Sequence, residues 1–473
     1  MPVLIRFFNH PSPSLSGYKK LKRQSDRKKD RYPIIRKKTN FFHVIPFYRQ
    51  NSIYIDMEQT ILIKNVRIFN GTDEETVMGD ILILNNRINK IAEPGTISAE
   101  GTVIDGKGKF LMPGLIDAHW HSYMCCNTMI DLLTAETSYT QLKAGVEAGK
   151  TLMRGFTTIR DAGGPVFGLK RAIDEGIIPG PRIYPSGSLI SQTGGHGDFR
   201  AVYDDPRPFG CCCLTHTEKI GAAIIADGVD AVTVAARNNL RLGASQIKLM
   251  TGGGVASLYD RLQDSQYFEE EIHAAVKAAE NAGTYVMVHV YVPQAITRAI
   301  QAGVKSIEHG HLIDEATMEL IARKEVWLCM QPFTLDDNQY PTQEQQEKHK
   351  MIVQNTDNAY RLAKKYQVKL GWGTDLLFNP ANTKNQNKDI GKLKNWFSNF
   401  EILKMVTYDN ARLLSLSGSR NPYPGDLGVI KEGAFADMLL INGNVLENIQ
   451  LLENPDDNIL LIIKDGQIYK NKL

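Results

Sequence analysis

Two histidines separated by one residue end an apolar stretch of the chain, the segment LMPGLIDAHWH that runs from Leu111 to His121. Because side chains alternate between the two faces of a strand, His119 and His121 point to one side and Trp120 to the other. Two imidazoles on the same side are able to share a metal ion. The spacing alone fits two polar residues at the start of a loop equally well, so the remaining ligands must decide.

Four further residues with metal-binding chemistry stand at the ends of other strand-like runs. They are Lys248 in QIKLM, His289 in VMVHV, His309 in SIEHGH and Asp375 in GWGTD. When parallel strands alternate with helices in a closed barrel, their carboxyl ends meet on one face. The sequence therefore predicts that these four residues and the two histidines above converge on one metal centre.

Lysine is an unusual member of such a set, because its protonated ammonium has no lone pair and repels cations. A desolvated, neutral Lys248 could instead add CO2 and become a carbamate, whose two oxygens can bridge two metals. We therefore expect two divalent ions and CO2 as cofactors, with a shared water that loses its proton near neutral pH and acts as the nucleophile. Imidazole and carboxylate ligands favour zinc and also accept manganese or iron.

Three residues near these strand ends are candidate substrate-binding groups. His196 lies in the glycine-rich segment SQTGGHGD, Tyr291 follows His289, and His311 faces the same side as His309 by strand alternation. Tyr259 and Tyr267 are comparable candidates that the sequence does not rank.

Further polar residues near these strand ends are given roles outside the metal centre. The TGGGVAS segment that follows Lys248 could offer backbone N–H groups to a substrate carboxylate, but lacks the Lys-Ser/Thr of a P-loop. Glu308 precedes His309 and is expected to point away from the metals. His273 and His349 lie on helical stretches and are expected at the surface.

Eight apolar runs are predicted to be strands, most of them separated by segments of helical length whose apolar residues recur every three or four positions. They are Phe110–His121, Thr157–Ala162, Arg182–Ile190, Gln246–Thr251, Tyr285–Val290, Ser306–His311, Val326–Gln331 and Lys369–Asp375. This pattern predicts an α/β fold, specifically a (β/α)8 TIM barrel. An open doubly wound sheet is the alternative, although no G-x-G-x-x-G opens the first helix.

The two ends of the chain have a different texture, with short strands and turn residues. We expect residues 57–112 and 419–473 to form a small β-sandwich that flanks a barrel of residues 113–418. Residues 1–56 contain 13 Lys and Arg and 3 Asp, against a net charge of +3 for the whole chain. We favour a misassigned start with translation from Met57; a disordered extension, a transit segment and a nucleic-acid-binding tail are the alternatives.

Composition describes an ordinary globular protein, with 42% hydrophobic and 23% charged residues. No apolar run is long enough to span a membrane, so no membrane association is expected. The six cysteines include the runs Cys125-Cys126 and Cys211-Cys212-Cys213, which match neither a disulfide framework nor a structural zinc site. A reduced, cytoplasmic setting is the simpler interpretation, and the triple cysteine has no motif that we can interpret.

Taken together, the motifs HWH after LMPGLIDA, QIKLMTGGG, VMVHVY, SIEHGH and GWGTD resemble the amidohydrolase superfamily. They are most similar to its imidazolonepropionase-like and prolidase-like branch with a carboxylated lysine, which includes an ochratoxin-hydrolysing amidase. The resemblance covers about Met57–Leu473. It implies that His119, His121 and Asp375 hold one metal, that His289 and His309 hold the other, and that carboxylated Lys248 bridges them. It also implies that Asp375 takes a proton from the attacking water and passes it to the leaving amine.

The resemblance implies an amidohydrolase that cleaves a C–N amide bond. The expected substrate is a small or dipeptide-like amide with a free carboxylate, such as an Xaa-Pro dipeptide or an N-acyl amino acid. Imidazolonepropionase itself uses a single metal and no lysine, so Lys248 argues against that substrate. A cyclic-amide hydrolase or a deaminase remains an alternative, as does a non-catalytic barrel scaffold. No nucleic acid partner is expected for the barrel. We expect the chain to form a homo-oligomer.

Overall fold

The computed structural model describes residues 59–206, 214–257, 259–335, 337 and 340–473 of the chain. The predicted basic extension, residues 1–56, and the cysteine run at 211–213 lie outside these residues. The fold below is that of the unit Met57–Leu473.

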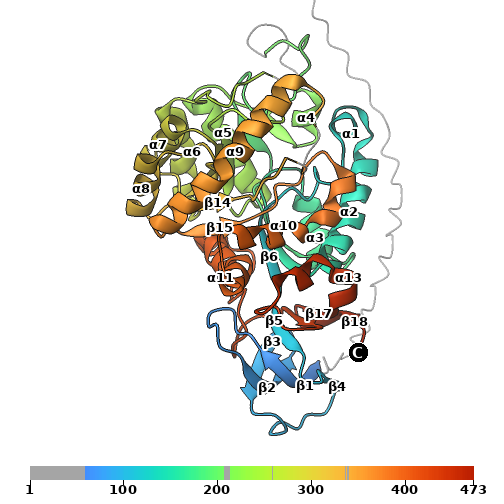
Figure 1. The fold of residues 1–473 in the computed structure, drawn as a ribbon. Helices are drawn as coiled ribbons and strands as arrows, with labels where there is room; N and C mark the ends of the chain where they lie inside the picture. Colours follow the sequence, from blue (N-terminus) through green and yellow to red (C-terminus); the bar gives the residue numbers. More distant parts are fainter. Residues whose placement is uncertain (1–58, 207–213, 258, 336, 338–339) are drawn as a thin grey trace, which may run out of the picture. The chain divides into compact units, whose positions relative to one another are not determined.

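Both ends of this unit contribute strands to one eight-stranded sheet (Figure 1). Its order is β18-β17-β16-β5-β1-β2-β3, with β4 paired to β1. The antiparallel pairing of β16 with β5 joins the C-terminal strands to the N-terminal ones. Hydrogen bonding thus places all eight strands in one sheet, and the predicted two-layered sandwich is not confirmed. The strands are β1 (Thr60–Ile68), β2 (Val77–Leu84), β3 (Arg87–Ala92), β4 (Thr102–Asp105), β5 (Phe110–Pro113), β16 (Met438–Ile441), β17 (Ile459–Lys464) and β18 (Gln467–Asn471).

Between these ends, parallel strands alternate with helices, which confirms the predicted α/β class. A three-stranded sheet contains β6 (Leu115–Trp120), β7 (Phe156–Asp161) and β8 (Arg182–Pro185). A seven-stranded sheet has the order β10-β9-β11-β12-β13-β14-β15. Its strands are β9 (Leu189–Ser191), β10 (Ala223–Ile225), β11 (Ile247–Met250), β12 (Val286–Val290), β13 (Ser306–His309), β14 (Trp327–Met330) and β15 (Leu370–Trp372).

The two parallel sheets face one another around a common interior, which we call the barrel. β8 and β9 are consecutive in the chain, and beyond the end of β15 the backbone N–H of Asp375 donates to the carbonyl of His119 in β6 at 2.8 Å. Arg160 of β7 reaches across the interior to Glu308 of β13 at 2.7 Å. The carboxyl ends of β6, β11, β12, β13 and β15 therefore open on the same side, as expected for a parallel barrel.

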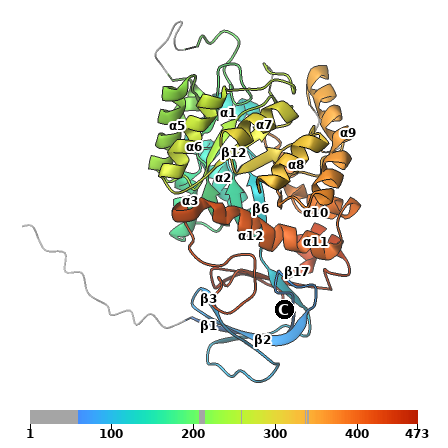
Figure 2. The same ribbon diagram turned by 90° about the vertical axis from the view of Figure 1, so that its left-hand side faces the viewer.

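Helices cover the outside of the parallel strands (Figure 2). In α6, for example, Ile272, Ala275, Val276 and Ala279 recur at the spacing of one helical face and are buried. The α-helices are α1 (Met129–Thr134), α2 (Thr137–Met153), α3 (Phe167–Asp174), α4 (His216–Lys219), α5 (Val229–Leu242), α6 (Glu269–Asn281), α7 (Pro293–Gln301), α8 (Glu315–Arg323), α9 (Gln343–Lys365), α10 (Lys388–Lys392), α11 (Asn399–Lys404), α12 (Asn410–Leu414) and α13 (Pro455–Asn458). Short helical turns are η1 (Pro380–Asn385), η2 (Leu393–Asn395), η3 (Met405–Asp409), η4 (Ser415–Arg420) and η5 (Ile449–Glu453).

Two predicted strands are wrong in their extent, each because a glycine interrupts it. The run Phe110–His121 divides at Gly114, where a Cβ would lie 2.1 Å from the hydroxyl oxygen of Thr157. The chain thus leaves the terminal sheet at β5 and enters the barrel at β6. The run Arg182–Ile190 divides into β8 and β9 around Gly187, whose φ of 76° is unfavourable for other residues.

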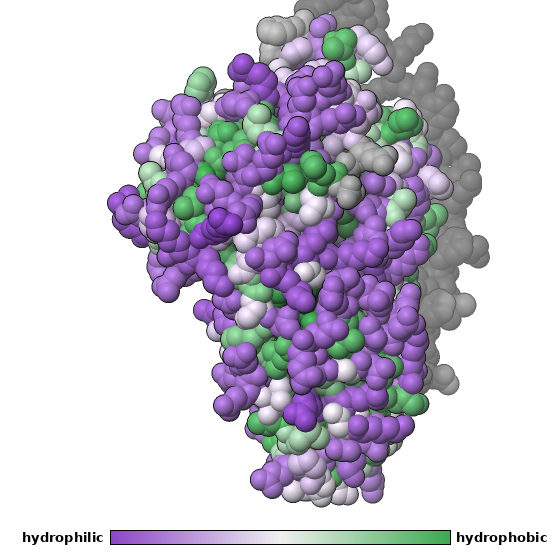
Figure 3. Space-filling view, viewed as in Figure 1, coloured by the Kyte–Doolittle hydropathy of each residue, from purple (hydrophilic) through white to green (hydrophobic). Residues whose placement is uncertain are grey.

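The molecular surface in Figure 3 is mostly polar, with small apolar areas scattered among charged side chains. Among the described residues, no helix combines the length and apolar character that crossing a membrane requires.

Candidate metal centre

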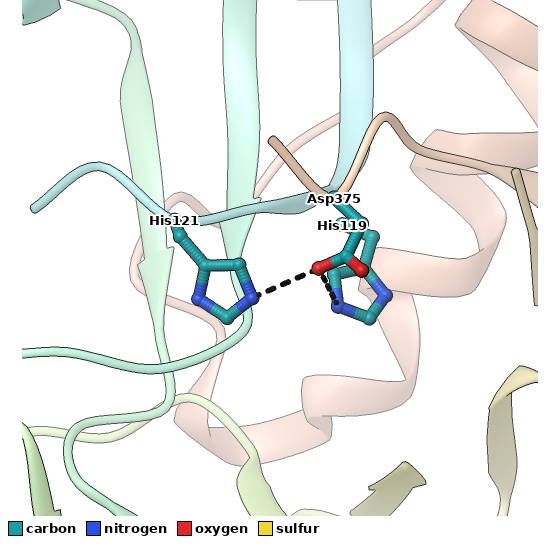
Figure 4. A group of neighbouring side chains, drawn as sticks. All are labelled: His119, His121 and Asp375. Atoms are coloured by element: carbon teal, nitrogen blue, oxygen red, sulfur yellow. Dashed lines mark hydrogen bonds and ion pairs between the residues drawn. The ribbon is translucent and has the colours of Figure 1, made fainter. Parts of the chain in front are cut away.

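His119, His121 and Asp375 meet at the mouth of the barrel (Figure 4). His119 lies in β6, His121 follows the end of that strand, and Asp375 follows β15. The Oδ1 atom of Asp375 lies 3.2 Å from Nε2 of each imidazole. A carboxylate oxygen and two imidazole nitrogens within this distance form a donor set that suits a divalent metal such as zinc.

The partners of the two imidazoles determine which nitrogen faces the centre. Nδ1 of His121 donates to the carbonyl of Gly163 at 3.0 Å. Nδ1 of His119 lies 2.8 Å from Oε2 of Glu308. Nδ1 of each ring thus lies against an oxygen of another element, and both Nε2 atoms face Asp375. Such outer hydrogen bonds are the arrangement that metal-binding histidines require, so these residues fit a metal ion.

His289 and His309 form the other half of the site. Their ring centroids are 4.5 Å apart, and that of His309 is 4.9 Å from His119. Nε2 of His289 donates to the carbonyl of Gly253 at 3.1 Å, which leaves its Nδ1 as the lone-pair nitrogen. Nδ1 of His309 donates to Oε1 of Gln331 at 2.7 Å, which leaves its Nε2 free. These two rings are therefore also neutral and prepared to bind a cation.

Lys248 of β11 stands between the two halves, with its Nζ 3.4 Å from Nε2 of His119. Its side chain is 1% exposed. Burial lowers the pKa of the lysine to about 8, against the opposing attraction of Glu308 and Asp375. Within the described residues, Lys248 forms no ion pair with a carboxylate. An amine in this environment is neutral often enough to react with CO2, so the lysine fits the bridging carbamate.

The carboxylate of Asp375 is held in its ionised form. Burial acts to raise its pKa, but the imidazoles of His119 and His121 outweigh that effect and hold the pKa well below its usual range. Its neighbour Asp161 at the end of β7 behaves oppositely, because burial raises its pKa to about 6. Asp161 accepts the backbone N–H groups of Ser122 and Gly163 and so shapes the turns on either side of His121.

Positive backbone angles turn two of these residues into the mouth of the barrel. His309 has a φ of 79° and Asp375 a φ of 54°, both rare for residues other than glycine. At His309 this angle breaks the alternation of the strand. Glu308 therefore faces the barrel interior and contacts His119, so the expectation that it points away from the site is wrong.

Glu308 also joins Arg160 in a buried ion pair, both side chains having no exposed surface. Burial alone would raise the pKa of Glu308, but Arg160, His119 and Lys248 together outweigh it and the pKa is lowered. Cys329 lies near Glu308 and His119, but burial raises the pKa of its thiol well above the usual range. A neutral thiol beside an already paired carboxylate is a poor metal site, so we assign this group to the floor of the barrel.

Asp117 is a residue of the site that the sequence analysis missed. Its carboxylate accepts the backbone N–H of His119 at 3.1 Å and that of Thr374 at 3.2 Å. It also accepts the Thr374 hydroxyl at 2.7 Å and the Gln386 amide at 3.0 Å. Asp117 thereby ties β6 to the segment that carries Asp375. The sequence signal was its place two residues before His119, on the same strand face.

A cavity of about 890 Å³ opens above these residues and is lined by all six candidate ligands. Of the candidate substrate-binding residues, the structure places His196 and Tyr291 in its lining. His311 is buried behind the lining, where its Nε2 bonds the carbonyl of Gln331 at 2.9 Å and its ring packs on Phe333. The strand ends at His309, so alternation does not extend to His311.

The remaining residues considered in the sequence analysis lie partly in the cavity lining and partly outside it. Tyr259 lines the cavity, whereas Tyr267 is buried with its hydroxyl on the carbonyl of Ala226. His273 is exposed, as expected. The expectation for His349 is wrong, because it is 5% exposed and contributes to the cavity wall beside Tyr340. Its position on the buried face of α9 explains this.

The TGGG segment does not offer the free backbone donors that the sequence suggested. The N–H of Gly253 donates to the carbonyl of Asp264 at 3.1 Å, and the N–H of Gly254 donates to Oδ2 of Asp260 at 3.0 Å. These two donors are engaged within the loop and are not available to a substrate carboxylate.

Comparison with known proteins places this chain among hydrolases. The sequence profile of the amidohydrolase family matches residues 110–469. An ochratoxinase from Aspergillus niger is 30% identical over 382 residues, which are 76% of this chain and 75% of that protein. A crystal structure of a prolidase in complex with N-methylphosphonate-L-proline is 32% identical with a TM-score of 0.80, and covers 87% of this chain and 100% of that one. A Xaa-Pro dipeptidase with methionine bound in its active site is 28% identical with a TM-score of 0.75, at the same coverage.

Proposed function

The chain belongs to the amidohydrolase family, and from this premise we propose that it is a two-metal hydrolase that cleaves a carbon–nitrogen amide bond. The observation that carries the proposal is the convergence of two imidazole nitrogens on one Asp375 oxygen, with the buried Nζ of Lys248 only 3.4 Å from His119. Neither a structural zinc site nor an ordinary buried histidine pair requires a desolvated lysine at this position.

The residues divide into holding and reacting groups. His119, His121 and Asp375 would hold one divalent cation, His289 and His309 the other, and carboxylated Lys248 would bridge them. When bound, the two cations supply Lewis-acid polarisation of an amide carbonyl and a water of lowered pKa. Zinc suits the nitrogen-rich donor set best.

Asp375 is placed to carry a proton between the attacking water and the leaving amine. Its Oδ1 faces both imidazoles, while its Oδ2 lies 4.0 Å from the nearest nitrogen of His309. The less engaged oxygen can take a proton from the attacking water and return it to the leaving amine. Tyr291 lines the cavity beside His289, and burial raises the pKa of its phenol well above the usual range. A hydroxyl that stays protonated is suited to donate to the substrate carbonyl.

For the substrate we propose a dipeptide or an N-acyl amino acid. A cavity of about 890 Å³ is large enough for a molecule of this size, within the range typical of small-molecule sites. The prolidase and Xaa-Pro dipeptidase relatives point to the dipeptide, and the ochratoxinase relative to an N-acyl amino acid. A cyclic-amide hydrolase or deaminase would use the same residues and is the second candidate. A non-catalytic scaffold is disfavoured because all six candidate ligands line one cavity.

The test is a hydrolysis screen of zinc-loaded protein against Xaa-Pro dipeptides, N-acyl amino acids and cyclic amides. The expected result is cleavage of one of the first two classes, abolished by a chelator and restored by zinc. Cleavage that persists unchanged in metal-stripped protein would refute the metal-dependent mechanism. Cleavage of cyclic amides alone would favour the second candidate.

A further inference from the structure

His196 is held more firmly than a loop residue of the cavity wall needs to be. Its ring stacks on that of His289, with centroids 4.0 Å apart and an interplanar angle of 18°. The backbone of Gly254 also lies against it, so close that a Cβ on Gly254 would be 1.9 Å from Cε1 and 2.0 Å from Nδ1 of the ring. The imidazole therefore has one position, which a side chain on residue 254 would remove.

A chain of hydrogen bonds determines where His196 carries its proton. Asp260 is 2% exposed, and its carboxylate accepts the N–H of Gly254 and the side-chain amide of Gln266, each at 3.0 Å. The same carboxylate accepts the hydroxyl of Ser257. Because the Ser257 hydroxyl donates its proton to Asp260, its oxygen accepts a hydrogen bond from Nδ1 of His196, which lies 2.8 Å away. The ring is thus protonated at Nδ1, and Nε2 carries a lone pair.

The lone pair at Nε2 is left for a ligand. No side chain among the described residues forms a hydrogen bond with this atom, although the ring lines the cavity next to His289. The His196 side chain is 14% exposed and lines the cavity, so a donor on the substrate can bond this atom in place of solvent. The complementary group is an N–H or ammonium donor, and a carboxylate would be repelled.

A buried carboxylate lies behind the imidazole of His196, whereas Lys248 and the proposed metal ions lie on its cavity side. Oδ2 of Asp260 lies 3.8 Å from Nδ1 of His196, on the far side of the hydrogen-bond chain from the cavity. Lys348 bonds the backbone carbonyl of Asp260, but its ammonium is paired with Glu344 at 3.0 Å. Asp198, another carboxylate of the cavity wall, is paired with Arg200. The negative charge behind the imidazole is therefore available to stabilise a cation in front of it.

We propose that His196 is a specificity-determining residue that accepts a hydrogen bond from a free amino group of the substrate. Ser257, Asp260 and Gly254 act as positioning residues that fix the tautomer and place of its ring. This inference rests on the proposed amide hydrolysis and deepens it, because it selects aminoacyl compounds such as dipeptides over N-acyl amino acids without an amine.

Alanyl-proline and propionyl-proline test the proposal, since they differ only in the amino group. With the metal-loaded full-length protein, kcat/KM is expected to favour alanyl-proline by about 10- to 100-fold, the range for one hydrogen bond to a charged group. The preference should fall toward unity in Ser257→Ala and Gly254→Ala. It should persist in Ser265→Ala, a matched change in the same loop at a hydroxyl outside the hydrogen-bond chain. Equal hydrolysis of both compounds by the unaltered protein would overturn the proposal.

A second measurement does not depend on turnover. In metal-loaded protein labelled with 15N at histidine, the His196 signals can be identified by their loss in His196→Asn. The proposal predicts an Nδ1–H, Nε2-unprotonated ring, and a change of that pattern in Ser257→Ala. An Nε2–H tautomer or an imidazolium would overturn it. If neither compound is cleaved, the proposed function is at fault, and the 15N pattern still decides the role of His196.

Discussion

The two halves of the metal centre are supported differently. Around His119, His121 and Asp375, the support comes mainly from strands and buried charges: Glu308 contacts one imidazole, and Asp117 ties β6 to the segment that carries Asp375. The other imidazole, that of His121, bonds the loop carbonyl of Gly163. Around His289 and His309, it comes from a loop carbonyl and a neutral side-chain amide.

The difference predicts that the first half of the centre contributes to the stability of the fold, whereas the second half contributes to the choice of substrate. Changes around the first half remove charges from the barrel interior and should weaken both metal binding and folding. Changes around the second half act on the Gly253 carbonyl, in the loop that also positions His196, or on the Gln331 amide, and should alter binding with little effect on folding. The predictions below test that division.

The largest effect is expected for Asp375→Asn. The amide keeps the shape of the side chain but loses the negative charge and the ability to take a proton. We expect kcat to fall by at least about a thousandfold, together with the metal content of the purified protein. Asp204→Asn, at an exposed position of the same cavity wall, is the matched control. Activity within tenfold of the unaltered protein would remove Asp375 from the mechanism.

Glu308→Gln should be the most damaging change to stability at the site. It leaves Arg160 buried without its carboxylate, which typically costs about 3–5 kcal/mol, and removes the charged partner of His119 Nδ1. Urea denaturation measures the first effect, and metal titration should show affinity lower by about 10- to 100-fold.

The double variant Arg160→Met/Glu308→Gln separates the two effects. Removing both charges should restore part of the stability without restoring metal affinity. A single Glu308→Gln variant as stable as the unaltered protein would show that this pair does not support the barrel.

The pKa of Lys248 predicts how reactivation of metal-stripped protein depends on pH. Only the neutral amine adds CO2, and its pKa of about 8 lies below the usual value of lysine. At a fixed concentration of dissolved CO2, the rate of activation by zinc should therefore rise about tenfold per pH unit below pH 8 and level off above it. Lys248→Ala should abolish bicarbonate dependence, with partial rescue by short carboxylates. A rate independent of pH between 6 and 9 contradicts carbamate formation.

The smallest effect is expected for Gln331→Leu. The substitution removes the acceptor of His309 Nδ1 but leaves no charge unpaired. Metal affinity should fall by about tenfold, with a midpoint of urea unfolding close to that of the unaltered protein. A loss of stability equal to that of Glu308→Gln would contradict the distinction between the two halves.

The sequence predicted the residues of the site better than their orientation. Strand alternation accounts for His119 and His121, which share one regular strand end. It fails at Glu308, His309 and His311, because the positive φ of His309 depends on the surrounding fold. The partners Gly253, Gln331 and Glu308 come from other elements and carry no local signal, so the tautomers could not be predicted.

The fold shows the same limit. Periodicity predicted parallel strands alternating with helices, which is local information. The glycine interruptions at Gly114 and Gly187 depend on the close approach of Thr157 and Asn239, far away in the chain. The pairing of β16 with β5, which joins the two ends in one sheet, is likewise a long-range contact.

The central claim is that two metal ions, held by both halves together, are needed for amide hydrolysis. Its most direct test is a titration of metal-stripped protein with zinc in the presence of bicarbonate, in which bound metal and hydrolysis of the best substrate from the screen are measured in the same samples. The account predicts full activity at two equivalents of bound zinc per chain. Full activity at zero or one equivalent would contradict it.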